Sequence, residues 1–354
     1  MDFDLLPPAL KDLLPAYSKP RDGELLSSWI VRMAYDHYLK SHVFCNLVFP
    51  KTPIWNRDID RMAPRSIVET LSRITPTSVQ GVEQCLLTSY EGTIFQKLNP
   101  NGATKWILPH GIYHRKRKDN GLMYCPTCLS NDLKVPYFRK VWRLSLFVVC
   151  PKCGYMLEDC CPRCGSPIVF FRNDLGNKNA DLAKPLSRCY SCSFDLKETT
   201  PTPVTRRFVR MQKYLIAIIE KRNTRFLFPH QYFDVLFQII KLINGRGNLS
   251  THLRKKLAKS LKIDLAISST TYTPFDMLGV KERRNILFCA YWLLLDWPDR
   301  FVNFCKENRI WSTFLLKDFE EAPFWFYSVV YSNLFISNIN RKFIGVRHLF
   351  SYYG

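Results

Sequence analysis

Cys125-Pro126-Thr127-Cys128, Cys150-Pro151-Lys152-Cys153, Cys161-Pro162-Arg163-Cys164 and Cys189-Tyr190-Ser191-Cys192 are the four CxxC pairs that decide how this chain is organised. Each pair places two thiolates in one tight turn, and a tetrahedral Zn²⁺ ion takes four such ligands. The eight cysteines therefore predict two closed Zn(Cys)₄ sites. The expected cofactors are two structural zinc ions.

The spacing of the pairs favours two successive zinc ribbons. Twenty-one residues separate Cys128 from Cys150, and twenty-four separate Cys164 from Cys189, which suits a strand pair between knuckles. In this sequential arrangement the first pair joins the second and the third joins the fourth. A cross-brace, which joins the first pair to the third and the second to the fourth, uses the same ligands, and the spacing leaves it open.

The motifs of catalysis are missing from the sequence. An all-cysteine ligand set leaves no coordination position for water or a substrate. The chain has no GxxxxGK[ST] loop and no HExxH helix, and none of its seven His is followed two residues later by Glu, as a zinc deaminase requires. Acidic pairs such as Glu320/Glu321 are typical of solvated surface. We therefore expect no enzyme and no small-molecule substrate.

The chain is strongly basic. Over 354 residues, 51 Lys and Arg oppose 30 Asp and Glu, which gives a net charge of +21. Two Zn(Cys)₄ centres would each carry −2 and would leave about +17. Such an excess predicts an anionic polymer as partner, whether DNA, RNA or a ribonucleoprotein. A basic surface that serves only solubility is the alternative.

Three groups of cations are candidates to contact nucleic-acid phosphates. The first is a basic run before the first knuckle, the second is interleaved with aromatic residues after it, and the third lies on C-terminal helices. For each group the alternative is an ordinary solvated or packing side chain. The candidates are Arg115, Lys116, Arg117, Lys118, Lys140, Arg143, Arg206, Arg207, Arg210, Arg254, Lys255 and Lys256.

The N-terminal part is predicted to be helical. Apolar residues at three- and four-residue spacing predict a helix that begins near Asp22 or Gly23 and turns Arg32 and Asp36 outward. Residues 64–91 then give two short helices around a break at 75–78, with Ser78 or Thr77 as a cap, in a helix-turn-helix-like pattern. The second helix offers no Arg or Lys, which favours packing over base reading.

The C-terminal part is also predicted to be helical. We expect helices that begin near Arg206, at Pro229 with a stop at 244–245, over the basic 252–257 and over 281–297. The sequence thus predicts a mainly α fold with a central small-β zinc-ribbon region. The predicted domains are 1–120 (N-terminal helical), 121–198 (tandem ribbons) and 199–354 (C-terminal helical).

No membrane segment is expected. The longest apolar run, 286–295, stops at Asp296, well short of the roughly 20 residues that span a bilayer. The first residues lack the features of a signal peptide, and paired free thiols fit a reducing compartment, so the expected location is the bacterial cytoplasm. The remaining cysteines are expected to be small buried hydrophobes: Cys45, Cys85, Cys160, Cys289 and Cys305.

Several motifs together resemble the TniQ family, the target-selection subunits of transposons. They are GELLSSWI (23–30), YCPTCL (124–129) with Asp132, YFR (137–139), WRL (142–144), VCPKCG (149–154), CPRCG (161–165), LLLDWP (293–298) and PFW (323–325). The cysteine block is the specific part of the resemblance. Many relatives have His where Cys153 stands, and Cys serves zinc equally well.

The resemblance implies a non-catalytic adaptor for transposition. Such proteins recognise a target and recruit an AAA+ ATPase and the transposase. One branch rides on a CRISPR RNA-guided effector of the Cascade type and forms dimers, whereas the longer TnsD-like branch binds a DNA attachment site directly. The length of 354 residues favours the RNA-guided branch, in which base pairing reads the sequence. Direct DNA binding is the alternative.

Overall fold

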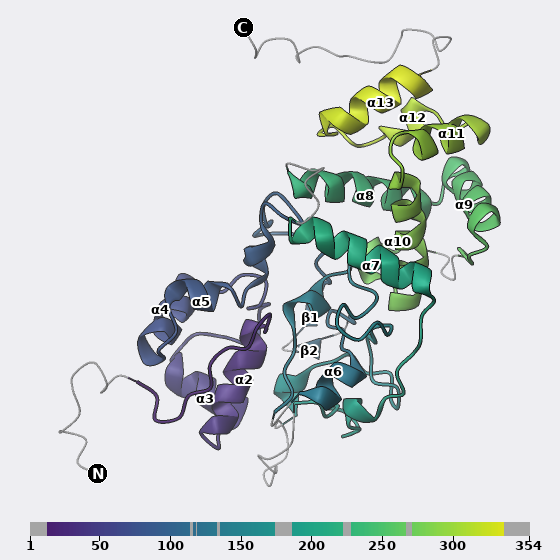
Figure 1. Ribbon diagram of the computed structural model, residues 1–354. Helices are drawn as coiled ribbons and strands as arrows, with labels where there is room; N and C mark the ends of the chain where they lie inside the picture. The colour runs from purple at the N-terminus through teal and green to yellow at the C-terminus, as the bar shows by residue number, and fades with distance from the viewer. Residues whose placement is uncertain are drawn as a thin grey trace, which may run out of the picture.

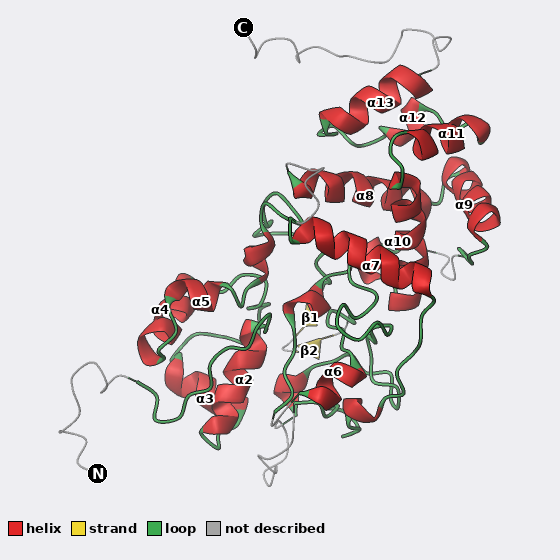
Figure 2. Cartoon of the chain, viewed as in Figure 1, coloured by secondary structure: helices red, strands yellow, loops and turns green. Residues whose placement is uncertain are grey.

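Helices dominate the computed structural model, which describes residues 13–113, 116–117, 119–132, 135–173, 186–221, 228–266 and 271–335 (Figures 1 and 2). Within these ranges one two-stranded antiparallel sheet occurs, formed by β1 (Ile112–Tyr113) and β2 (Lys116–Arg117). The mainly α fold predicted from the sequence is confirmed.

The N-terminal unit consists of α2 (Leu26–Asp36), α3 (Ser41–Val48), α4 (Arg65–Ile74) and α5 (Val79–Glu83). The apolar face predicted for the first helix packs with α4 and α5 in a core of its own. Figure 1 shows this unit apart from the C-terminal helices and beside the cysteine region.

One side chain of α2 contradicts the sequence-based prediction. Arg32, expected to turn outward, is buried and forms an ion pair with Glu24 at 2.8 Å. Its guanidinium also donates to the carbonyl of Lys19. Helical periodicity assigns charged residues to the solvent face, and it misses a charge whose partner comes from the chain segment that precedes the helix.

The helix-turn-helix-like pair is present but short. Ser78 caps α5, because its Oγ accepts a hydrogen bond from the Gly81 amide at 3.1 Å, as one of the two predicted caps. The helix ends at Glu83 instead of running toward Gly92, and a 3₁₀ turn follows at Leu87–Tyr90. Leu86 packs in the N-terminal core while Leu87 packs in the larger core, which one continuous helix face does not allow.

The cysteine region has little regular structure. It contains α6 (Pro126–Asn131) and 3₁₀ turns at Lys140–Arg143, Phe170–Arg172 and Leu196–Glu198. In place of the predicted ribbon strands, isolated bridges join Tyr124 to Glu158, Val149 to Met156, Cys160 to Pro167 and Arg188 to Asp195. The apolar residues 147–149 predict a strand that runs into Cys150, but it is reduced to the bridge from Val149 to Met156, and the Gln212 side-chain oxygen accepts hydrogen bonds from the amides of Val148 and Val149.

The C-terminal part is a helical array. Its elements are α7 (Arg206–Ile219), α8 (Pro229–Asn244), α9 (Asn248–Leu261), α10 (Val280–Leu294), α11 (Asp299–Glu307), α12 (Ser312–Leu315) and α13 (Phe324–Leu334). Helix α10 packs against α7 and α8, and α13 packs against α11 and α12 at the end remote from the cysteine region (Figure 1). The helices predicted near 206, 229 and 281 are confirmed. The basic helix predicted over 252–257 is longer than expected, since α9 spans Asn248–Leu261.

One large core joins the cysteine region to the C-terminal helices. The domain boundaries at 120 and 198 therefore stay predictions, since the second one crosses a continuous packed interior. Cys45, Cys85, Cys289 and Cys305 are buried as expected, and Cys160 is half-buried. Across the described part of the chain, no helix combines the length and the apolar character that crossing a membrane requires.

Candidate metal centres and their supports

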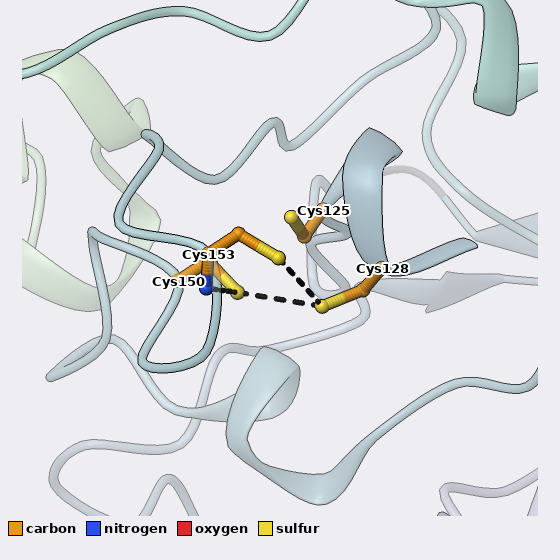
Figure 3. Close-up of side chains that lie close together, drawn as sticks. All are labelled: Cys125, Cys128, Cys150 and Cys153. Atoms are coloured by element: carbon orange, nitrogen blue, oxygen red, sulfur yellow. Dashed lines mark hydrogen bonds between the residues drawn. The ribbon is translucent and has the colours of Figure 1, made fainter. Parts of the chain in front are cut away.

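The first candidate metal centre gathers Cys125, Cys128, Cys150 and Cys153, whose Sγ atoms all lie within 4.8 Å of one another (Figure 3). Cys128 Sγ lies 3.5 Å from Cys150 Sγ and 3.4 Å from Cys153 Sγ. A tetrahedral Zn²⁺ with bonds of about 2.3 Å to sulfur separates its ligands by roughly 3.8 Å. Four sulfurs at this spacing fit one zinc ion.

The second candidate centre gathers Cys161, Cys164, Cys189 and Cys192. The Sγ atoms of Cys161 and Cys192 are 3.6 Å apart, as are those of Cys164 and Cys189. Cys164 is exposed, whereas three ligands of the first centre are buried. The structure thus groups the pairs sequentially and not as a cross-brace.

All four knuckles share one backbone hydrogen bond. The amide four residues after the first cysteine donates to that cysteine's carbonyl: Leu129 to Cys125 at 3.0 Å, Gly154 to Cys150 at 2.9 Å, Gly165 to Cys161 at 2.8 Å and Ser193 to Cys189 at 2.9 Å. Gly154, Gly165 and Ser193 all have positive φ, between 57° and 75°. Glycine adopts this conformation without strain, which explains CxxCG at two knuckles. The first pair instead opens α6, with Cys125 at the N-cap.

Hydrogen bonds lower the pKa of one cysteine in each cluster, whereas burial raises the pKa of others, such as Cys189. Hydrogen bonds from the Cys125 and Cys128 thiols, together with the amides of Cys153 and Lys152, lower the pKa of Cys150 to about 2. Hydrogen bonding by Ser166 lowers the pKa of Cys164 to about 6. The thiolate is the form that binds a metal. With four sulfur donors, each centre would be closed, and a bound ion would hold the fold together without meeting a substrate.

A buried polar joint fixes the N-terminal unit to the cysteine region. Glu24 accepts hydrogen bonds from both Arg32 nitrogens and from Ser28, each at 2.8 Å. Ser28 Oγ in turn accepts from the amide of Phe138 at 3.0 Å, and Glu24 forms a backbone bridge with Arg139. Two of the sequence motifs, GELLSSWI and YFR, therefore meet in space, and their polar residues satisfy one another.

Arg143 forms the centre of a second part of this joint. Its side chain is fully buried and donates to both Asp58 oxygens, at 2.9 and 2.5 Å, and to the carbonyl of Leu108. Asp60 lies 3.6 Å from Arg143 and accepts from the amide and hydroxyl of Ser27 on α2, each at 2.7 Å. This network links the N-terminal unit to the cysteine region through opposite charges, and each of its residues forms hydrogen bonds.

The structure corrects two candidate phosphate contacts. Arg143 is buried and paired with Asp58 and Asp60. Lys140 is also buried, and its ammonium lies 2.7 Å from Ser89 Oγ and over the Tyr90 ring. Burial also lowers the pKa of Lys140. Interleaved cations and aromatic residues were expected to follow a nucleic-acid backbone, but both side chains point into the joint.

Asp58, Asp60 and His110 form a further group with metal-ligand spacing. The Arg143 guanidinium already lies against both carboxylates. Burial raises the pKa of Asp60, and Arg143 opposes that rise. The cation that lies between Asp58 and Asp60 is therefore the guanidinium of Arg143, a side chain of the same protein.

A second joint connects the cysteine region to the C-terminal helices. The Asp159 carboxylate accepts from the amide of Val280 at the start of α10, at 2.8 Å, and Ser145 donates to Asp276. Arg283 is fully buried between these segments and donates to the Leu278 carbonyl at 2.8 Å. The cysteine region is thus fixed on both sides.

The remaining basic candidates differ in exposure. Arg206, Arg207, Arg210 and Lys255 are exposed, while Lys256 is half-buried. Arg254 donates to the carbonyls of Ile243 and Gly245 at the end of α8. Arg115 and Lys118 lie outside the described residues, and the side chains of Lys116 and Arg117 are likewise outside them.

The residues that build the N-terminal joint and the first cysteine cluster also match a known family model. The TniQ family model matches residues 15–157. These residues form a TniQ domain. A search of curated proteins found no match to it. The second cluster and the C-terminal motifs LLLDWP and PFW lie beyond the matched residues, so their family resemblance stays a prediction.

The TniQ domain indicates a coarse role for this protein. TniQ domains are non-catalytic accessories of transposition, and they imply a transposon-associated role in target selection. The two clusters are able to hold zinc ions, which agrees with the prediction from the cysteine spacing.

Proposed function

We propose that this TniQ protein is a non-catalytic adaptor that links a CRISPR RNA-guided, Cascade-type effector to an AAA+ ATPase and the transposase of a DNA transposon. Zinc in both cysteine clusters would stiffen its centre. The observation that carries the proposal is α5, the helix in the place of a recognition helix. It has five residues, Val79–Glu83, and none is basic.

The surroundings of α5 support the same reading. Its only charged residue, Glu83, lies 3.4 Å from Arg65 on α4. Sequence-specific contacts in the major groove come mainly from Arg, Lys, Asn and Gln near the start of a recognition helix. An adaptor in an RNA-guided system does not need such contacts, because the guide RNA reads the target.

The joints explain how an adaptor would work mechanically. Buried hydrogen-bonded charges fix the cysteine region to α2 on one side, and Asp159 fixes it to α10 on the other. Partner surfaces on the two ends are then held at a set distance and orientation. Exposed cations on α7, including Arg206 and Arg210, would add nonspecific phosphate contacts.

The alternative is a TnsD-type selector that binds an attachment site directly. The observation that favours it is the capped helical pair α4–α5, which has the order of a helix-turn-helix. Gln80 in α5 is the kind of side chain that pairs with adenine.

Reconstitution separates the two. The purified zinc-loaded protein is mixed with a guide-loaded Cascade-type complex and resolved by size-exclusion chromatography. We expect co-elution, together with weak DNA binding that shows the same affinity for any sequence and falls steeply with salt. A protected footprint on one DNA site at physiological salt, abolished by Gln80→Ala, would instead establish the direct selector. Sedimentation of the free protein tests the dimer that the resemblance implies.

Basic residues on α7 provide a matched comparison. Arg206→Ala/Arg210→Ala should reduce the steepness of the salt dependence of DNA binding, by about 0.9 for each phosphate that α7 no longer neutralises. Arg65→Ala removes an exposed cation that is already paired with Glu69 and Glu83, so it should leave that slope unchanged. Equal effects of the two changes would show that α7 has no special part in DNA binding.

A further inference from the structure

Helix α13 exposes a continuous row of aromatic side chains. Phe324, Tyr327, Tyr331 and Phe335 are exposed by 82, 41, 50 and 48%. Their spacing of three, four and four residues places them along one side of the helix and its C-cap. Among the described residues, four of the thirteen exposed large apolar side chains thus fall within twelve consecutive positions.

Neighbouring rings of this row contact one another. The ring centroids of Tyr327 and Tyr331 are 5.7 Å apart with nearly parallel planes, and those of Tyr331 and Phe335 are 5.0 Å apart. These contacts order the aromatic side chains before any partner arrives. Prior ordering lowers the entropy cost of binding, and Tyr is frequent at the energetic centre of protein interfaces.

The side of α13 next to the aromatic row is already packed. Phe326, Val330 and Leu334 are fully buried, and Phe326 packs against Trp297 and Phe301 near α11. The aromatic row therefore adds nothing to the core, while the buried side holds the helix in place. Figure 1 shows α13 at the end of the molecule remote from the cysteine region, where a partner can approach it.

The charge around the row identifies the chemistry of the partner. Helix α13 itself has no charged residue, and exposed Asp318, Glu320 and Glu321 precede it. Residues 296–335 contain six acidic against four basic side chains, although the whole chain carries +21. Local negative charge repels phosphates and attracts Lys and Arg. This argues against stacking of nucleic-acid bases on the aromatic row.

We propose that the exposed side of α13 docks an amphipathic helix of a protein partner, one with an apolar stripe at i, i+3/i+4 and i+7 and with Lys or Arg along its edge. The stripe would pack on Tyr327, Tyr331 and Phe335, and the cations would face Glu320 and Glu321. This docking surface goes beyond the proposed adaptor role, and it can fail while the RNA-guided or direct targeting role stands.

The test uses the full zinc-loaded chain and a fluorescent probe peptide. The probe is an 18-residue helix with Leu at the stripe positions and Lys on both edges; controls replace every Lys by Glu, or scramble the order. We expect binding of the Lys peptide with a Kd on the order of 10 μM, at least tenfold tighter than either control. Higher salt should weaken the complex.

Variants locate the binding. Tyr331→Ser and Phe335→Ser should each weaken binding of the Lys peptide about five- to tenfold. The double change Glu320→Lys/Glu321→Lys should reduce the difference in Kd between the Lys peptide and the Glu peptide. Tyr38→Ser removes an aromatic side chain that is 80% exposed on the N-terminal unit, and should leave binding unchanged. Because all these side chains are exposed, melting temperature and zinc content should stay at the unmodified values.

Three results would overturn the proposal. Equal affinity for the three peptides would show that the row has no preference for a basic helix. Conversion of a dimer to a monomer by Tyr331→Ser, seen in sedimentation, would make the row a contact between copies of this chain. Loss of single-stranded DNA binding in the same variant would make it a stacking surface for bases.

Discussion

Arg143 offers the sharpest test of whether the motif residues hold the structure together or face a partner. The change Arg143→Met keeps most of the side-chain volume and removes the charge. In the native protein the guanidinium is fully buried and lies against Asp58 and Asp60, whose side chains are 17 and 5% exposed. The variant leaves two neighbouring carboxylates without their counter-charge.

The expected loss of stability is large. Removing one partner of a buried ion pair destabilises a protein by roughly 3–5 kcal/mol, because the other charge stays buried without compensation. The partial exposure of Asp58 favours the lower end, about 3 kcal/mol. Since about 1.4 kcal/mol corresponds to a factor of ten, amides that open with this joint should exchange roughly a hundredfold faster. The Ser27 amide, which donates to Asp60, and the Leu108 amide, which donates to the Arg143 carbonyl, report this opening.

Hydrogen exchange followed by mass spectrometry on the zinc-loaded protein measures the effect. Burial raises the pKa of Asp60, and Arg143 opposes that rise, so the pKa should rise further in the variant. A carboxyl whose pKa is higher in the folded state costs stability above that pKa, and the penalty falls as pH decreases. The destabilisation should therefore diminish as the pH is lowered toward the Asp60 pKa, and Asp58→Asn should recover part of it.

Arg65→Met is the matched control, because Arg65 is an exposed arginine that also pairs with two carboxylates. It should leave exchange unchanged. If the Ser27 and Leu108 amides exchange as slowly in the Arg143→Met variant as in the native protein, while DNA binding is weakened, the assignment of Arg143 to an internal joint is wrong. The original interpretation as a phosphate contact would then return.

Three further predictions concern the metal centres and one buried acid. Metal analysis should find about two zinc ions per chain, and Cys161→Ser should leave about one, with faster exchange confined to residues 161–192. Gly154→Ala should cost about 1–2 kcal/mol because φ is 75° there, whereas Gly154→Asn should recover much of it; thermal melting and chelator competition measure both. Burial raises the pKa of Asp276 to about 6. The contribution of Asp276 to the free energy of unfolding should therefore fall as the pH rises from 4 to 6, and Asp276→Asn should remove this pH dependence.

Sequence patterns predicted the features that depend on neighbouring residues. The CxxC pairs predicted both cysteine clusters, because each turn brings two thiols together without help from distant chain segments. Apolar periodicity predicted α7, α8 and α10, and Pro229 with Gly245 marked the limits of α8.

Features that depend on distant partners were not predictable in this way. Arg143 meets Asp58 across 85 residues, so its basic character suggested solvent or phosphate instead of a buried pair. Arg32 was misplaced because its partner, Glu24, lies in the segment before the helix, which helical periodicity does not take into account. The strand predicted at 147–149 is reduced to a bridge between Val149 and Met156, and the side-chain oxygen of Gln212, on a helix more than sixty residues later, accepts from the Val148 and Val149 amides.

The position of these joints limits what the family resemblance can reveal. The matched residues 15–157 include Glu24, Arg32, Asp58 and Arg143, all held in internal contacts, together with the first cysteine cluster. These residues fix the N-terminal unit to the cysteine region, and as partners of one another they are not free to meet another molecule. We therefore expect the difference between RNA-guided and direct targeting to lie in surface residues, such as those of α5, α7 and α13, and α7 and α13 lie beyond the matched residues.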